Sequence, residues 1–162
     1  METYKIDEID LKILKLLQSN GRLSKAKIAQ SVHLSEVPCW RRVRQLENCG
    51  FISSYVALIN QAMLGYSFYA FVQLKVVLDG PEASRLFRAT ISQLPEILGL
   101  YSTTGEFDYV LFVVARDVNE FGQFLEEQLR HRPGICRINT SVVLETIKSD
   151  TSINLQLLAR QT

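Results

Sequence analysis

The chain has 162 residues, of which 47% are hydrophobic, and this composition is too apolar for a disordered chain. Its three cysteines are odd in number and irregularly spaced, which argues against a disulfide framework and is typical of a reducing cytoplasm. No run approaches the ~20 apolar residues of a membrane-spanning helix, and the first residues lack a signal-peptide pattern, so we expect no membrane partner. The net charge is only +1, but six basic residues and one acidic residue lie between Gly21 and Gln45.

Two short helices are predicted at the start of the chain. Asp7 is a good N-cap for the first, with Asp10 at its third position, and Asn20-Gly21 ends it. Ser24 caps the second helix. The apolar positions at helical spacing are Ile9, Ile13, Leu14 and Leu17 in the first helix and Ile28, Ala29 and Val32 in the second.

A third helix is predicted between Leu34 and Gly50. Ser35 is a good N-cap, and Gly50 can take the left-handed backbone that ends a helix. At about 100° per residue, one side of this helix carries Cys39, Val43 and Leu46, and the other carries Val37, Arg41, Gln45 and Asn48, with Arg42 and Arg44 on its flanks. The pattern predicts a helix-turn-helix, and a DNA major groove accepts a helix with an arginine-rich outer side.

The segment from Phe51 to Ile59 is strand-like, and we interpret it as a small wing or as the lead-out to a second domain. Beyond it, alternating and helical patterns predict the order β-α-β-β-α-β. The expected strands are 68–76, 97–104, 109–115 and 135–147, and the expected helices start near Asp79 and Asp117. The inward stripes are Ala83, Leu86, Phe87, Thr90 and Ile91 in one helix and Phe121, Phe124, Leu125 and Leu129 in the other. The order is the split βαβ or ferredoxin-like arrangement, so the fold class is α+β.

Several blocks of residues, at matching spacing, resemble the Lrp/AsnC (leucine-responsive and asparagine regulator) family of bacterial and archaeal transcription factors. They are Asp7-x-x-Asp10-x-x-Ile13-Leu14, Asn20-Gly21-Arg22-Leu23-Ser24, Ile28-Ala29-x-x-Val32-x-Leu34-Ser35, and Pro38-Cys39-x-Arg41-x-x-x-Leu46-Glu47-x-x-Gly50 with Ile52. One departure is His33, where such proteins commonly have glycine. The resemblance implies a winged helix-turn-helix domain at 1–60, a linker at 61–66, and a ligand-binding and oligomerisation domain of the RAM (ACT-like) type at 67–162.

By this resemblance, the third helix recognises double-stranded DNA. The residues expected at the interface are Lys25, Lys27, Ser35, Glu36, Val37, Pro38, Arg41, Arg42, Arg44 and Gln45. Arginine can bind a phosphate or a guanine edge, and the start of a helix can bind a phosphate. The alternative is a solvated basic face on a helical bundle. We expect Trp40 to pack against the first helix, and we expect the protein on the nucleoid in the cytoplasm.

An open four-stranded sheet with helices on one face leaves the other face uncovered, and oligomerisation can cover it. The resemblance implies dimers that pair sheet to sheet and assemble further, often as a tetramer of dimers in an octameric ring. The tail has spare apolar side chains that can add an edge strand or pack on a neighbour. They are Ile153, Leu155, Leu157 and Leu158.

The stretch from Tyr101 to Tyr109 matches the family's Gly-[Asp/Glu]-[Phe/Tyr]-Asp-Tyr motif, near which an amino-acid effector binds between dimers. The candidate effector-binding residues are Tyr101, Ser102, Thr103, Thr104, Gly105, Glu106, Phe107, Asp108 and Tyr109, with Thr140 and Ser141 on the last strand. A carboxylate can hold the ammonium of an amino acid, and amides and hydroxyls can hold its carboxylate. The alternative is that Asp108 only closes the hairpin turn and that Gly105 only supplies a positive φ.

These patterns favour a transcription regulator whose DNA binding is modulated by a small effector, an amino acid, and we expect the coupling to run through its assembly. The alternative is an architectural DNA-binding protein that has no effector. An enzyme is disfavoured because His33 and His131 do not lie at metal-ligand spacing with the cysteines, and no nucleophile–base pair or phosphate-binding glycine loop is visible. We therefore expect no catalytic residue, no metal and no cofactor other than the effector.

Overall fold

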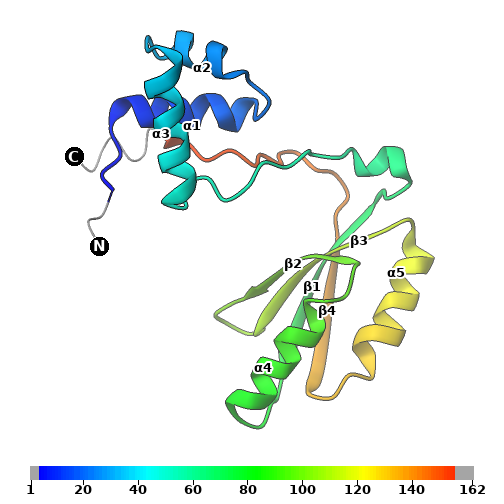
Figure 1. The fold of residues 1–162 in the computed structure, drawn as a ribbon. Helices are drawn as coiled ribbons and strands as arrows, with labels where there is room; N and C mark the ends of the chain where they lie inside the picture. Colours follow the sequence, from blue (N-terminus) through cyan, green and yellow to red (C-terminus); the bar gives the residue numbers. More distant parts are fainter. Residues whose placement is uncertain (1–3, 156–162) are drawn as a thin grey trace. The chain divides into compact units, whose positions relative to one another are not determined.

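The computed structural model describes residues 4–155, which form two compact units (Figure 1). The helical unit combines the residues up to Leu58 with those from Lys148 onward, and the sheet unit runs from Ile59 to Ile147. The chain therefore returns to its first unit after completing the second. The sequence predicts one second domain over 67–162; by its contacts, the segment from Lys148 lies with the helical unit.

The three predicted helices of the helical unit are confirmed as α1 (Glu8–Ser19), α2 (Lys25–Ser31) and α3 (Glu36–Asn48). Asp7 caps α1 in a capping box, in which its carboxylate accepts the Asp10 amide at 2.9 Å. The Ser24 hydroxyl accepts the Lys27 amide at 3.3 Å at the start of α2. Ser35 occupies the N-cap position of α3, but its side chain makes no capping hydrogen bond, so that detail of the prediction was wrong.

The core of the helical unit lies where the helical spacing predicted it. The buried residues of this core are Ile13, Leu14, Ile28, Ala29, Val32, Cys39, Val43 and Leu46. Cys39 is a small apolar filler here, and burial raises the pKa of its thiol, which keeps it protonated. His33, in the turn between α2 and α3, has the left-handed backbone, with a φ of 58°.

The segment from Phe51 to Ile59 forms no strand, which corrects the prediction of a strand-like wing. A strand needs a hydrogen-bonding partner, and no neighbouring strand borders this segment in the part of the chain that is described. One of its side chains is nevertheless fixed: the Tyr55 hydroxyl donates to Glu47 of α3 at 2.9 Å. The short helix η1 (Gln61–Leu64) follows and ends at Gly65.

The sheet unit has the predicted β-α-β-β-α-β order. Its strands are β1 (Phe68–Val76), β2 (Ile97–Ser102), β3 (Tyr109–Ala115) and β4 (Ile135–Val142), all paired antiparallel in the order β2-β3-β1-β4. Its helices are α4 (Gly80–Ile91) and α5 (Val118–Phe124), which continues as the π-helical segment η2 (Leu125–Arg130).

Two of these strands are shorter than the sequence suggested. β2 stops at Ser102 because the Thr103 amide donates to the Asp108 carbonyl at 3.0 Å, which closes a turn. β4 ends at Val142, which pairs with Ala70 near the start of β1, and one further backbone bond joins the Val143 amide to the Tyr69 carbonyl at 2.9 Å. Strand length is thus set here by the partner and not by the local pattern.

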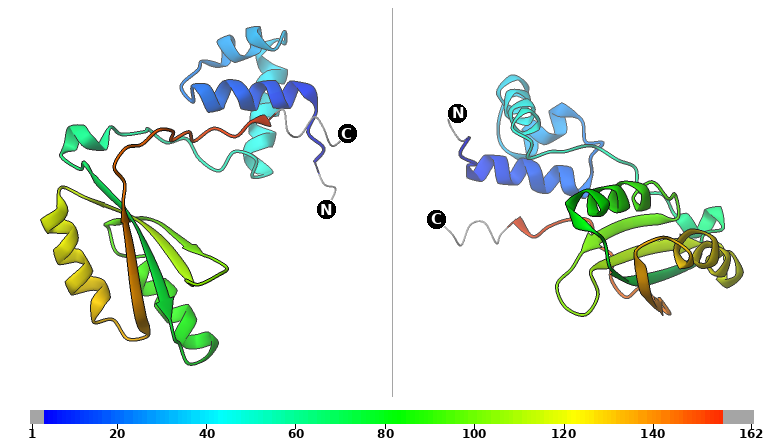
Figure 2. Two further views of the ribbon diagram at one scale, coloured as in Figure 1. Left: turned by 180° about the vertical axis from the view of Figure 1, so that it is seen from behind. Right: turned by 90° about the horizontal axis from the view of Figure 1, so that it is seen from below.

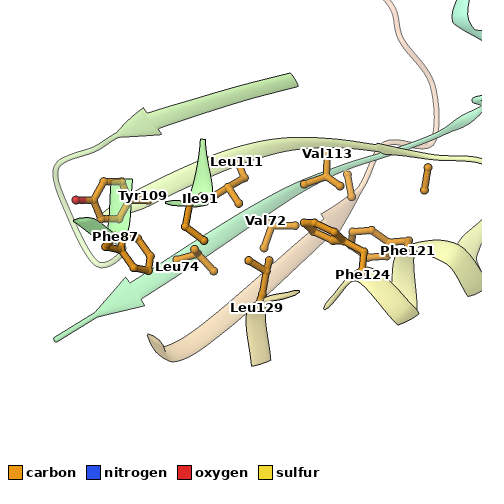
Figure 3. Packing of buried hydrophobic residues seen from close by; sticks show 12 residues of the cluster. Val72, Leu74, Phe87, Ile91, Tyr109, Leu111, Val113, Phe121, Phe124 and Leu129 are labelled. Carbon is orange, nitrogen blue, oxygen red and sulfur yellow. The ribbon is translucent and has the colours of Figure 1, made fainter. Parts of the chain in front are cut away.

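Helices α4 and α5 cover one face of the sheet (Figures 1 and 2), and the second hydrophobic core lies between these helices and the sheet. Figure 3 shows Val72, Leu74, Leu111 and Val113 of the sheet packed against Phe87 and Ile91 of α4 and Phe121, Phe124 and Leu129 from the other helix. Leu86, which we expected in the α4 stripe, is 65% exposed. Phe87 and Ile91 define the buried side of α4. Leu86 precedes Phe87 by one residue, which places it about 100° around the helix from that side.

The opposite face of the sheet is open. Its apolar part is an aromatic cluster in which the Phe112 ring stacks on Tyr69 at 5.9 Å and lies 5.2 Å from the ring of Phe71. Phe71 is 43% exposed, although its chain neighbours Ala70 and Val72 are buried on the helix side. As predicted, side chains alternate along β1 between the face that is packed against the helices and the face that no helix covers.

The end of the described chain lies against α1. The Ile153 amide donates to Oε1 of Gln18 at 2.9 Å, and Nε2 of Gln18 donates back to the Ile153 carbonyl at 3.3 Å. Leu155 packs against the core of the helical unit. Of the predicted apolar tail residues, Leu157 and Leu158 lie outside the described residues.

Candidate DNA-binding helix and candidate ligand site

The outer side of α3 is free to meet a ligand. Val37 is 82% exposed, and Arg41, Arg44 and Gln45 are exposed as well. Within residues 4–155, no carboxylate pairs with the guanidinium groups of Arg41 or Arg44. These two arginines therefore retain the charge and the hydrogen-bond donors that contact with DNA requires.

The start of α3 and the start of α2 are equally accessible. Ser35, Glu36, Pro38 and Lys27 are all exposed. Lys25 is exposed too, but its ammonium lies 3.9 Å from the centroid of the Trp40 ring. Trp40 is partly buried and packs against the core of the helical unit, so its interpretation as a packing residue is supported by its position.

Arg42 does not share the situation of Arg41 and Arg44. Its Nη1 atom lies 2.6 Å from Oδ2 of Asp7 and 2.9 Å from Oδ1 of Asp10, and its side chain is only 31% exposed. The guanidinium is held inside the helical unit by α1. We therefore remove Arg42 from the set of candidate DNA contacts. Helical angle alone placed it on the flank of the basic side and could not show the carboxylates beside it.

These ionic contacts perturb the groups that make them. Burial raises the pKa of Asp7, but hydrogen bonds from the Asp10 amide and from Arg42 outweigh burial, and the net pKa lies below its usual value. Hydrogen bonds to Asp10 and Asp7 raise the pKa of Arg42. Burial, together with a hydrogen bond to Asp10, raises the pKa of the Tyr4 hydroxyl to about 12. The shifts of Asp7 and Arg42 both favour the charged forms that make this ion pair.

A polar cavity of about 540 Å³ lies beside the loop that joins β2 and β3. Its lining comes from that loop and from the open face of the sheet. The lining residues are Gln73, Thr103, Thr104, Glu106, Phe107, Val110, Arg137 and Asn139. Four of the eleven candidate effector residues, Thr103, Thr104, Glu106 and Phe107, are therefore brought together here.

The cavity contains two polar pairs. Nη1 of Arg137 lies 2.5 Å from Oε1 of Glu106, and the guanidinium also lies 5.3 Å from the centroid of the Phe107 ring. Nδ2 of Asn139 donates to Oε1 of Gln73 at 2.7 Å. Sequence reasoning missed Gln73, Arg137 and Asn139. The signal was present, since alternation along strands β1 and β4 places these residues on the open face with Phe71.

Other candidate effector residues lie away from the cavity. The side chain of Tyr109 is buried on the helix side of the sheet, 5.4 Å from the Phe87 ring (Figure 3), which corrects its assignment. The Tyr101 ring lies over Gly99, where an added Cβ would come within 2.8 Å of it. Ser102, Thr140 and Ser141 are exposed but do not line the cavity. These five candidate residues therefore do not line this cavity.

Asp108 fixes the β2–β3 loop to the end of β1. Its carboxylate accepts the Val76 amide at 2.9 Å and the Lys75 ammonium at 3.2 Å. The Val76 hydrogen bond lowers the pKa of Asp108 against a smaller effect of burial, and Lys75 lowers it further. Gly105 has a φ of 108°, which only glycine adopts readily. These contacts match the alternative in which both residues shape the turn.

A helix-turn-helix with an exposed basic helix, joined to a βαββαβ sheet with a polar cavity, defines a DNA-binding regulator with a small-ligand domain. Residues 6–53 match the model of winged helix-turn-helix DNA-binding domains, and residues 69–153 match that of the Lrp/AsnC ligand-binding domain. The chain belongs to the Lrp/AsnC family of transcription regulators, which are not enzymes.

Relatives match along nearly the whole chain. The leucine-responsive regulatory protein of Salmonella typhimurium is 36% identical over 148 residues, which are 91% of this chain and 90% of the relative. The transcriptional activator DecR of Escherichia coli K12 is 32% identical over 151 residues, 93% and 99% of the two chains. A Neisseria meningitidis regulator, solved as a complex with L-Met, is 35% identical with a TM-score of 0.90 and covers 95% of this chain and 99% of its own.

No helix within residues 4–155 is long and apolar enough to cross a membrane. The same residues contain no group of three or more histidine, cysteine or acidic side chains arranged to hold a metal ion.

Proposed function

We propose that this regulator binds an amino acid in the cavity beside the β2–β3 loop and that the bound amino acid modulates its affinity for DNA. The observation that carries the proposal is the Glu106–Arg137 ion pair inside the cavity. An amino acid carries one ammonium and one carboxylate. A site with one carboxylate and one guanidinium offers the complementary charge for each.

Both charges of the pair are accessible for exchange. The side chains of Arg137 and Glu106 are 63% and 68% exposed, so their contact with each other is weak and can be replaced by contacts with a ligand. The Thr104 hydroxyl and the Gln73–Asn139 amide pair are further polar groups beside them. The N. meningitidis relative, solved with L-Met, supports an amino acid as the class of ligand.

The proposed DNA contacts are divided by position. Arg41, Arg44 and Gln45 project from the exposed side of α3, where they can reach base edges or phosphates. The residues at the start of α3, Ser35, Glu36, Val37 and Pro38, border the same side, and Lys25 and Lys27 suit backbone phosphates. Three to five such contacts per copy give modest, salt-sensitive affinity.

Several copies acting together would raise that affinity. The open sheet face, with its exposed Phe71 and the partly buried Phe112 beside it, supports pairing with a second copy. We propose a dimer that assembles further into a tetramer of dimers, with the cavity near the interface between copies. Such an assembly would act on the nucleoid in the cytoplasm and would set the spacing of the DNA-reading helices.

The test is calorimetric titration of the full chain with each of the twenty common amino acids, followed by DNA-binding curves with and without each one that binds. We expect at least one amino acid to bind and to change the DNA affinity. Arg137→Gln should weaken that binding about 10- to 100-fold, the effect of losing a charged hydrogen bond. The control is Arg85→Gln, which removes an exposed ion pair with Glu82 on α4, away from the cavity. An absence of binding throughout would favour an architectural protein without an effector.

A further inference from the structure

We infer that Arg42 is a positioning residue for DNA recognition: it fixes α3 against α1 and makes no contact with DNA itself. Arg42 lies on the recognition helix, between Arg41 and Val43, and carries the same charge as its proposed DNA-binding neighbours. Its guanidinium, however, bridges two carboxylates of the α1 start, at 2.6 Å from Asp7 and 2.9 Å from Asp10.

The partner of Arg42 is an unusual carboxylate. The Asp10 side chain is 0% exposed and is the one charged residue among the buried side chains described. It accepts three hydrogen bonds, from the Tyr4 hydroxyl at 2.8 Å, the Asp7 amide at 3.2 Å and Arg42. A buried carboxylate that loses its cationic partner is strongly destabilised, so this contact fixes Arg42 in one place.

The apolar contacts of α3 cannot fix its orientation as sharply. Cys39, Val43 and Leu46 bury one side of the helix, and apolar contact is non-directional, so it tolerates a small rotation. A guanidinium that is shared between two carboxylates tolerates much less, because charge-assisted hydrogen bonds depend on angle as well as distance. The Arg42 contacts therefore select one rotation of α3 about its own axis.

That rotation decides where the DNA-facing side chains point. Arg41 precedes Arg42 by about 100° around the helix, and Gln45 follows Arg42 by about 300°. A rotation of α3 about its axis would therefore move both Arg41 and Gln45 away from the DNA groove that they are proposed to contact. The capping box of α1 thereby has a second role, as the reference against which the recognition helix is oriented.

The test uses the full chain and a DNA duplex selected by this protein from a random pool, with affinity measured across a range of salt concentrations. We expect Arg42→Gln to lower the affinity about tenfold while the slope of log K against log[salt] stays that of the wild type. Arg41→Gln is the comparison for a direct phosphate or base contact and should reduce that slope by about 1.

Two further variants keep the inference falsifiable if Arg42→Gln folds poorly. Asp7→Asn keeps an oxygen for the Asp10 amide but removes the charge beside Arg42, on a residue that is no candidate DNA contact; we expect about threefold weaker binding with an unchanged slope. Ile13→Val lowers the stability of the same core without touching this cluster and should leave the affinity unchanged.

Two outcomes would overturn the inference. A reduced salt slope in Arg42→Gln, equal to that of Arg41→Gln, would make Arg42 a direct contact. A fall in melting temperature with unchanged affinity in Asp7→Asn and in folded Arg42→Gln, as for Ile13→Val, would leave the cluster a purely stabilising role.

Discussion

The side-chain amide of Gln18 forms two hydrogen bonds with the backbone of Ile153, which lies 135 residues further along the chain. An amide side chain in this position pairs with the tail much as a neighbouring strand would, with one donor and one acceptor. Leu155 adds an apolar contact with the core of the helical unit. The last described segment is therefore held on α1 by specific contacts.

Replacing Gln18 should release this segment. Gln18→Ala removes both hydrogen bonds, which together contribute about 1 kcal/mol at an exposed site, so the undocked state should become about fivefold more populated. Limited trypsin digestion after Lys148 should accelerate by that factor, since cleavage requires local opening. Gln30→Ala, an exposed glutamine on α2 that does not contact the tail, is the control, and an equal rate in both variants would contradict the prediction.

His33 should be replaceable by glycine with a gain in stability. Its φ of 58° costs a residue with a Cβ about 1 kcal/mol, which glycine avoids. We expect His33→Gly to raise the melting temperature of the helical unit by several degrees in calorimetry. Gln30→Gly, in a helix, should have the opposite effect, because there glycine adds only conformational entropy to the unfolded chain. A lower melting temperature for His33→Gly would show that the imidazole makes a compensating contact.

Acid should destabilise both units through one carboxylate in each. Hydrogen bonds lower the pKa of Asp7 in the helical unit and of Asp108 in the sheet unit below the ordinary value of 3.8. A lowered folded-state pKa means that the unfolded chain binds protons more readily, so this stability is fully present above about pH 4 and is lost as pH falls through the folded-state pKa.

The measurement is the urea midpoint between pH 7 and pH 2.5 for the wild type and for Asp108→Asn. The variant should start from a lower midpoint at pH 7 and lose less of it in acid, since it lacks one of the two carboxylates whose pKa is lowered in the folded state. Parallel curves would mean that Asp108 contributes nothing to the acid response.

Phe71 should be required for self-association. It lies on the open face of the sheet beside Phe112, and a lysine there would place a charge in the proposed interface. Light scattering after size exclusion should show Phe71→Lys as a smaller species than the wild type. Leu86→Lys is the matched control, because Leu86 is also an exposed apolar residue but lies on α4. The proposed pairing is wrong if both variants keep the wild-type mass.

The elements of the fold were predictable from local patterns. Residues 68–76 and 109–115 were expected as strands and are β1 and β3, and the capping box at Asp7 marked the start of α1. Local patterns failed where a distant partner decides. Residues 51–59 look strand-like but pair with no strand in residues 4–155, and residues 143–147 continue the β4 pattern beyond Val142, the last residue that pairs with β1.

The candidate sites were predicted less completely for the same reason. The helical angle of Arg42 resembles that of an exposed arginine, and only the position of α1 places Asp7 and Asp10 beside it. The motif from Gly105 to Tyr109 located the cavity, but its other half comes from Gln73, Arg137 and Asn139 on β1 and β4. A motif marks one side of a site, and sheet register supplies the rest.

The division of the chain also bears on how the protein is made. Because the helical unit is built from both ends of the described chain, the sheet unit is an insertion within it. A ribosome adds about 5–20 residues per second, so α1 emerges on the order of ten seconds before Ile153 is synthesised. The DNA-binding helices therefore exist on a nascent chain without their tail. Any chain terminated early in its last strand would carry a recognition helix but not the segment that docks on α1.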